Sequence, residues 1–215
     1  FKMISIKTFV FNPFEENTYL AIDDEKNCII IDPGCYDNEE FIKLSRFIDN
    51  NNLKVKKIIN THGHIDHIFG VKKTADTYNI IPEIHFLEKN LLDIMDWQAG
   101  LFGIKEPEMP NTWNYIYDET EILFGINKIR IIHVPGHSPG SIALYFHDNK
   151  ILLSGDILFN GSIGRTDFPG GSYETLITGI KEKLLLLPED TIIYPGHGLT
   201  STIKNETQHN PFLKY

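Results

Sequence analysis

The sequence predicts an α/β protein in which two sheets pack together with helices outside, a four-layer αββα sandwich. Short apolar segments with strand-like alternation occur before, between and after segments with helical periodicity. Most connections between them are short, and the 215 residues suit one domain, residues 1–215. Periodicity alone supports only a mixed α/β class, and the order of the segments favours the layered arrangement.

The N-terminal half alternates between predicted strands and helices. Strands are expected at 4–11, 18–22, 28–31, 55–60 and 81–86, and helices at 37–51, 68–78 and 88–97. Asp37 or Asn38 can cap the first helix, because a short polar side chain there precedes an apolar stripe formed by Phe41, Leu44, Phe47 and Ile48. Residues 99–114 break the periodicity with two glycines and two prolines. This stretch is either an ordered loop near a site or a surface excursion.

The C-terminal half is richer in strands. They are expected at 121–124, 128–134, 142–147, 150–153 and 191–194. One helix is predicted over 173–187, and Pro188 ends it. Repeats and low-complexity tracts are absent from the sequence.

Charge and composition exclude several classes of partner. The formal net charge is −9 without any Lys/Arg run, which disfavours nucleic acid. The longest apolar stretches are far shorter than the ~20 residues of a membrane span, and the N-terminus does not resemble a signal peptide. Cys28 and Cys35 are too few for a disulfide framework and are expected to be buried thiols in a reducing compartment, the cytoplasm.

A cluster of histidines follows the predicted strand 55–60. His62, His64 and His67 lie within six residues, and Asp66 lies among them. Imidazole and carboxylate groups are ligands for zinc, iron and manganese. The alternative is a solvated surface run of histidines, but a metal site also needs distant ligands, and the sequence supplies them.

Three further ligand-type side chains stand at predicted strand ends beside glycine: His137, Asp156 and His197. Strand ends on a rigid sheet are where sites accumulate. The resulting set predicts two metal ions. One ion would be bound by His62, His64 and His137, and the second by Asp66, His67 and His197. Asp156 would bridge both, because a carboxylate has two oxygens.

The segment His62-Gly63-His64-Ile65-Asp66-His67 resembles the H-x-H-x-D-H signature of the metallo-β-lactamase superfamily. His137, Asp156 and His197 follow in the order of that family, and Asp32-Pro33-Gly34 resembles its early strand-end motif. The resemblance extends from about Asn17 to Phe212 and implies the αββα sandwich.

Two segments indicate a subgroup. Residues 161–171 resemble those of glyoxalase II-like thioesterases and persulfide dioxygenases, and Pro195–Gly198 with Asn210–Phe212 are most similar to short, hydroxyacylglutathione hydrolase-like enzymes. The resemblance implies hydrolysis of a thioester, such as an S-acylglutathione-like compound, by a metal-bridging hydroxide. Asp66 and Asp156 would be catalytic, and the cofactors would be two divalent ions, Zn first and Fe or Mn as alternatives. The C-terminal helical domain with which longer glyoxalase II enzymes bind glutathione does not appear before Tyr215, so the resemblance supports the thioester more than glutathione itself.

Four other residues are secondary candidates. Arg165 is expected either to bind a substrate carboxylate or to pair with Asp167. Asp32 either supports a ligand histidine or caps a turn. Tyr19 and Phe159 either line the substrate pocket or pack in the core.

Two competing functions come from other classes. The first is a mononuclear iron persulfide (sulfur) dioxygenase, which would use His62, His137 and Asp156. The second is a noncatalytic metal-binding domain, which the complete ligand set disfavours. Lactam hydrolysis is weaker because Asp156 stands where zinc β-lactamases proper have cysteine, and RNA cleavage is weaker for lack of length and basic surface. The expected partner is a small-molecule substrate, with no nucleic acid and no membrane, and the oligomeric state is open.

Overall fold

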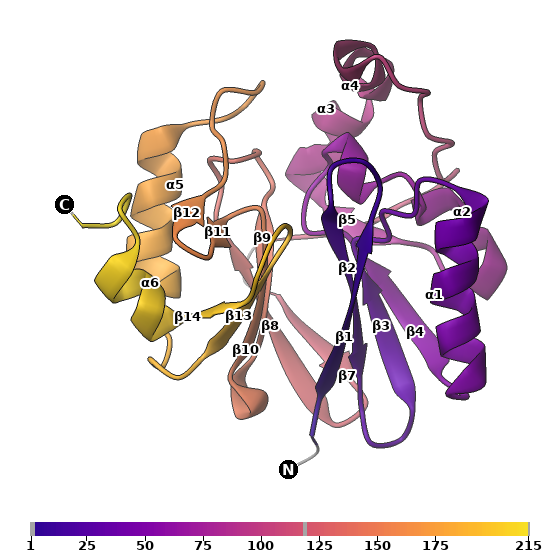
Figure 1. Cartoon of the computed structure of the whole chain (residues 1–215), viewed down its shortest axis with the longest axis horizontal. Coiled ribbons are helices and arrows are strands. Elements are labelled where there is room, and N and C mark those ends of the chain that lie inside the picture. Colours follow the sequence, from indigo (N-terminus) through magenta and orange to yellow (C-terminus); the bar gives the residue numbers. More distant parts are fainter. Residues whose placement is uncertain (1–2, 118–119, 215) are drawn as a thin grey trace. The chain divides into compact units, whose positions relative to one another are not determined.

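The computed structural model describes residues 3–117 and 120–214, and the chain divides into two compact units, Phe1–Ile116 and Tyr117–Tyr215. Each unit contains one six-stranded sheet with helices packed on it (Figure 1). The predicted α/β class is therefore confirmed. The prediction of a single domain over 1–215 stays a prediction.

The sheet of the first unit follows the order of the chain. Its strands are β1 (Ser5–Phe11), β2 (Glu16–Ile22), β3 (Asn27–Ile31), β4 (Lys54–Ile59), β5 (Glu83–His85) and β6 (Asn114–Ile116). The first three strands pair antiparallel, and β3 to β6 pair parallel. Parallel strands end at the same sheet edge, so the loops after β3 and β4 begin side by side. The hydrogen bond from Asp32 N to Ile59 O, 3.0 Å, joins these two strand ends.

Helices α1 (Asn38–Asn50) and α2 (Val71–Tyr78) cover one face of this sheet (Figure 1). The Asp37 carboxylate accepts hydrogen bonds from Glu39 N and Glu40 N and so begins α1, which makes Asp37 and not Asn38 the cap. The buried stripe of α1 packs into a cluster that includes Leu20, Ile30 and Ile58 of the strands. The packing of α1 on these strands stabilises the part of the sheet from which the loop after β4 begins.

The segment after β5 differs from its predicted form. A short 3-10 turn, η2 (Phe86–Glu88), leads into α3 (Lys89–Leu92) and then α4 (Met95–Phe102). The prediction of a single helix over 88–97 is wrong in extent. The prediction that the irregular stretch begins at residue 99 is also wrong, because α4 continues to Phe102. Buried Met95, Gln98 and Ala99 anchor α4 inside the unit, and Gly103 at φ 65° ends it. Strand β6 was not predicted either.

The second unit has a mixed sheet in the order β14, β13, β10, β9, β8, β7. These strands are β7 (Glu121–Phe124), β8 (Asn127–His133), β9 (Ile142–Phe146), β10 (Ile151–Gly155), β13 (Ile192–Pro195) and β14 (Ser201–Thr202). A 3-10 turn, η3 (His147–Asn149), joins β9 to β10, and β11 (Leu158–Phe159) with β12 (Ser162–Ile163) forms a small separate sheet. The five predicted strands of this half all occur, with ends that differ by at most two residues.

Helices α5 (Tyr173–Gly179) and α6 (Ile203–His209) pack on this second sheet (Figure 1). The helix predicted over 173–187 is observed as α5 and a π-helical turn, η4 (Ile180–Leu184). Leu176, Ile180 and Leu184 join a core with residues of β8, β9, β10 and β13. Helix α6 lies in a stretch for which the sequence predicted no element.

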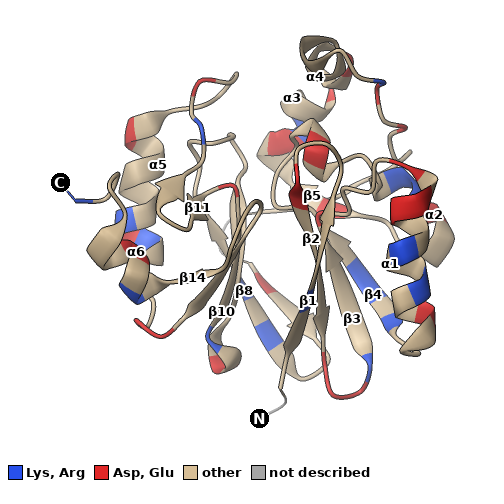
Figure 2. Cartoon of the chain, in the orientation of Figure 1, with Lys and Arg blue, Asp and Glu red and all other residues tan. Residues whose placement is uncertain are grey.

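Surface and thiol properties are ordinary. Charges of both signs are interleaved on α2, where Lys72 pairs with Asp76 (Figure 2). Among the described residues, every helix is too short or too polar to cross a membrane. Both cysteines are free and buried, as expected, and burial raises the pKa of Cys28 from 9.0 to about 12 and that of Cys35 further.

Candidate metal centre

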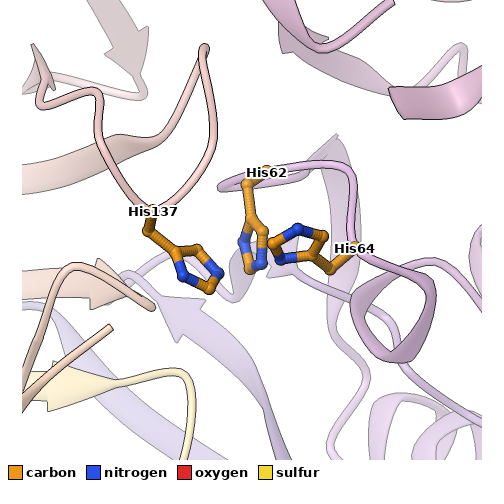
Figure 3. Close-up of side chains that lie close together, drawn as sticks. All are labelled: His62, His64 and His137. Carbon is orange, nitrogen blue, oxygen red and sulfur yellow. The ribbon is translucent and has the colours of Figure 1, made fainter. Parts of the chain in front are cut away.

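The loop after β4 carries the first group of predicted ligands. His62, His64 and His67 are only 1%, 6% and 0% exposed. The ring centroid of His62 lies 4.7 Å from that of His64 and 4.2 Å from that of His67. Figure 3 shows the rings of His62 and His64 on this loop. Three imidazoles are therefore gathered in a buried turn, rather than displayed as a solvated surface run.

The Asp32 carboxylate supports this loop from the end of β3. Its Oδ1 accepts from Thr61 N at 2.6 Å, and its Oδ2 accepts from Thr61 Oγ1 at 2.6 Å. The same Oδ2 lies 3.0 Å from Nδ1 of His67. A carboxylate on Nδ1 orients the ring and leaves Nε2 as the metal-binding nitrogen. Asp32 thus both anchors the loop backbone and contacts a predicted ligand.

Two further carboxylates approach His67. Oδ2 of Asp66 lies 3.7 Å from its Nε2, and Oε1 of Glu16 lies 4.0 Å from its Nδ1. Glu16 is fully buried and accepts from Thr18 Oγ1 at 2.9 Å. Burial raises the pKa of Glu16 well above its ordinary value, and the nearby His67 opposes this shift. Sequence reasoning missed Glu16, although an acidic residue at the start of the buried strand β2 was a signal.

The second unit gathers the remaining predicted ligands. His137 lies on the loop after β8 (Figure 3), Asp156 follows β10, and His197 follows β13. Oδ2 of Asp156 lies 3.6 Å from Nε2 of His137 and 3.5 Å from Nε2 of His197. The other ring nitrogen of His137, Nδ1, is 2.8 Å from the carbonyl oxygen of Arg165. That contact orients the His137 ring with Nε2 toward the carboxylate.

These spacings fit a metal ion. Nitrogen and oxygen ligands ~2.0–2.1 Å from a tetrahedral ion lie roughly 3.4 Å from one another. The 3.5 and 3.6 Å separations around Asp156 match that value. In the first unit, the carboxylate contact at Nδ1 of His67 is the arrangement typical of a histidine that binds metal through Nε2. The donor set of each unit therefore suits a divalent cation. The division of all seven ligands between two ions stays a prediction.

The contacts of Arg165, Phe159 and Tyr19 do not by themselves indicate a role in substrate binding. Arg165 donates from Nε and Nη2 to both oxygens of Asp167, at 2.7 and 2.8 Å, and its guanidinium lies 3.7 Å from the Phe168 ring centroid. This pair lowers the pKa of Asp167 from 3.8 to about 2. The ring of Phe159 is 6.3 Å from that of His197, and Tyr19 is buried on β2. Substrate binding by these residues stays a prediction.

Comparison with known proteins identifies the family. The sequence model of the Metallo-beta-lactamase superfamily matches residues 12–197. A hydroxyacylglutathione hydrolase, GloC, from Haemophilus influenzae is 39% identical over 98% of both chains. A probable metallo-hydrolase, YqgX, from Bacillus subtilis is 38% identical over 94% of this chain and 93% of its own length.

Solved structures agree with this. The BLEG-1 B3 metallo-beta-lactamase superposes with a TM-score of 0.91 at 35% identity, over 98% of this chain and 100% of its own. The di-iron-bound form of TTHA1623 superposes with a TM-score of 0.86 at 34% identity, over 96% of this chain and 100% of its own. These matches confirm the predicted metallo-β-lactamase fold and the resemblance to glyoxalase II-like proteins. From its family match, its full-length relatives and its buried histidine–aspartate donor sets, we conclude that this chain belongs to the metallo-β-lactamase superfamily and is a metallo-hydrolase.

Proposed function

We propose that this chain is a binuclear thioesterase that hydrolyses an S-acylglutathione-like compound in the cytoplasm. The observation that carries the proposal is the Asp156 carboxylate, whose one oxygen lies within 3.6 Å of two imidazole Nε2 atoms. A carboxylate with two oxygens can bridge two cations. The hydroxyacylglutathione hydrolase relative, similar along its whole length, supports the thioester as the substrate class.

The seven predicted ligands would divide between two cations. His62, His64 and His137 would bind one ion, and Asp66, His67 and His197 the other, with Asp156 shared. Zinc suits imidazole and carboxylate donors, and the di-iron-bound relative makes iron the first alternative. Such cations, when bound, activate water and polarise a carbonyl group.

The protein side chains would complete the chemistry. The carboxylate of Asp66, which lies 3.7 Å from Nε2 of His67, would hold the proton that water gives up. The leaving thiol has an ordinary pKa of about 8.5 and departs without a strong general acid. Asp32 would hold the His67 tautomer that carries its proton on Nδ1, which presents Nε2 as the metal-binding nitrogen.

Charge and thiol content support the expected partners. A net charge of −9 disfavours nucleic acid and anionic membrane surfaces and leaves a small-molecule substrate as the expected partner. Free buried cysteines are typical of a reducing compartment, which supports the cytoplasm.

The test combines metal analysis with two assays. Metal content per chain is measured first, and then hydrolysis of S-lactoylglutathione is followed beside oxygen uptake with glutathione persulfide. Two metals per chain with thioester turnover is the expected result. One iron per chain with oxygen uptake would show a dioxygenase instead, and turnover of a β-lactam alone would move the chain toward the lactamase relative.

A pair of variants tests the carboxylate itself. Asp156→Ala should lose at least one metal and reduce turnover by roughly 10²-fold or more, as expected when a metal ligand is removed. Asp148→Ala is the matched control in the same unit, because Asp148 is exposed and its carboxylate lies beside the ring of His147, which is also exposed. Full metal content and turnover in Asp156→Ala would contradict the proposal.

A further inference from the structure

We infer that Gln98 and Glu88 are positioning residues that clamp the peptide of Gly63, and so hold His62 and His64 in the geometry in which they bind metal. The inference rests on the proposed metal-binding role of these histidines. It adds two residues for which the sequence analysis found no role. Both belong to the segment whose helices were predicted with the wrong boundaries.

Gln98 binds the ligand loop through both ends of its side-chain amide. Its Nε2 donates to Gly63 O at 3.1 Å and to Leu91 O at 3.0 Å, and its Oε1 accepts from Ile65 N at 3.0 Å. The side chain is only 3% exposed. The primary amide thus pairs with the loop backbone much as a neighbouring strand would. Because these bonds are buried, losing them leaves polar groups without compensation from water.

Glu88 binds the backbone N–H of Gly63, the residue whose carbonyl oxygen Gln98 binds. Its Oε2 accepts from Gly63 N at 2.6 Å, and the side chain is fully buried. A carboxylate as acceptor makes a shorter and stronger bond than a neutral group. The N–H and the carbonyl oxygen of Gly63 are therefore both held, by two different side chains.

The glycine between the two histidines allows this close approach. A Cβ added at Gly63 would lie 3.0 Å from Glu88 Oε2 and 3.4 Å from both Leu91 Cβ and Leu92 Cδ2. Helix α3 therefore packs directly against the loop backbone. A side chain at position 63 would therefore crowd the Glu88 carboxylate that binds the Gly63 N–H.

The clamp affects metal affinity because it fixes both peptide groups of Gly63, which join the ligands His62 and His64. Displacing ligands by even ~1 Å weakens a site that needs its geometry prepared in advance. Residues that orient ligands typically contribute 10–100-fold to metal affinity. Gln98 and Glu88 act through the backbone, so we expect the lower end of that range.

The first experiment replaces Gln98 by a residue of similar size without its hydrogen bonds. In metal-free Gln98→Met, backbone amides of the loop 61–67 should exchange with solvent at least ~10-fold faster than in the wild type, because local opening is easier. Zinc affinity, measured by competition with a chromophoric chelator, should fall by about 10-fold. Unchanged exchange in the loop would overturn the inference.

The matched control removes an equal number of hydrogen bonds elsewhere in the same unit. The Asp23 carboxylate accepts from Glu25 N, Asn27 N and Asn27 Nδ2 in the turn between β2 and β3, at the opposite end of the sheet. Asp23→Ala should lower the melting temperature as Gln98→Met does, but it should leave zinc affinity and loop exchange at wild-type values. An equal loss of affinity in Asp23→Ala would show that Gln98 acts through general stability alone.

A second, milder pair of variants covers the case in which Gln98→Met does not fold. Gly63→Ala should push the Glu88 carboxylate away and reduce zinc affinity, whereas Gly100→Ala, with open space around its Cβ, should not. Equal affinities for Gly63→Ala and wild type would contradict the clamp. If the wild type bound no metal, the proposed function would fail, and amide exchange in the metal-free proteins would still decide whether the clamp exists.

Discussion

Asp32 shows how a single side chain can serve the backbone and a ligand together. Its φ of 49° is in the left-handed region, which Asp and Asn tolerate better than other non-glycine residues. This conformation places the carboxylate against Thr61 and His67 at once. The sequence left support of a ligand histidine and capping of a turn as alternatives. The contact with Nδ1 of His67 is of the first kind, and the backbone N–H that the carboxylate accepts from belongs to Thr61 of the ligand loop and not to a local turn.

The residue-scale prediction concerns Asp32→Asn. Asparagine tolerates the same backbone conformation, but it has one acceptor oxygen in place of two and cannot accept from Thr61 N, Thr61 Oγ1 and Nδ1 of His67 together. Zinc affinity should therefore fall by about 10–100-fold while the protein remains folded. Chelator competition measures the affinity, and Asp76→Asn on the exposed face of α2 is the control. Equal affinities for Asp32→Asn and wild type would refute the role of Asp32.

At the scale of elements, α4 shows why helix boundaries escape sequence patterns. Gly100 is a weak helix former, and its presence made the segment look irregular. Three buried residues of α4 nevertheless pack inside the first unit, and this packing stabilises the helix as far as its last residue, Phe102. The C-cap at Gly103 then ends it through a left-handed turn.

Two glycine substitutions test this account of α4. Gly100→Ala should raise the free energy of unfolding by about 0.5–1 kcal/mol, because Gly100 is exposed and open space surrounds its Cβ. Gly103→Ala also meets open space, but its φ of 65° should make the change destabilising by about 1 kcal/mol. Urea denaturation measures both changes. Effects of the same sign would show that the backbone conformation does not control the outcome.

At the scale of the whole molecule, the predicted ligands come from both units of the chain. The first unit contributes His62, His64, Asp66 and His67, and the second contributes His137, Asp156 and His197. A metal that binds the folded chain and not the unfolded one stabilises it by mass action, by about 4 kcal/mol when its concentration is 1,000 times its dissociation constant. Shared ions would make this stabilisation depend on both units.

The whole-molecule prediction follows from that dependence. Zinc should raise the melting temperature of the metal-free protein, and the rise should be largely lost in His62→Ala and equally in His197→Ala. His147→Ala is the control, since that side chain is 80% exposed on η3. Calorimetry with and without a chelator measures the shift. A full zinc-induced rise in either ligand variant would argue against ions shared between the units.

Much of this protein could be predicted from its sequence because strand ends are marked locally. Apolar runs followed by His62, His137 or Asp156 beside glycine indicate both the strand and the position of the ligand. Alternation and helical stripes were sufficient for the α/β class and for α1. The short elements β6, β14 and α6 were missed, because two to seven residues are too few for a periodic pattern.

By itself, the sequence determined the α/β class, the superfamily and the candidate metal ligands, since each depends on residue types at fixed local spacing. Only the tertiary structure decided the surroundings of those ligands. Glu88 and Gln98 meet Gly63 across 25 and 35 residues, and Asp32 meets His67 across 35. The physical reason is that hydrogen bonds to buried groups form between segments that folding brings together, and sequence spacing carries no record of such distances.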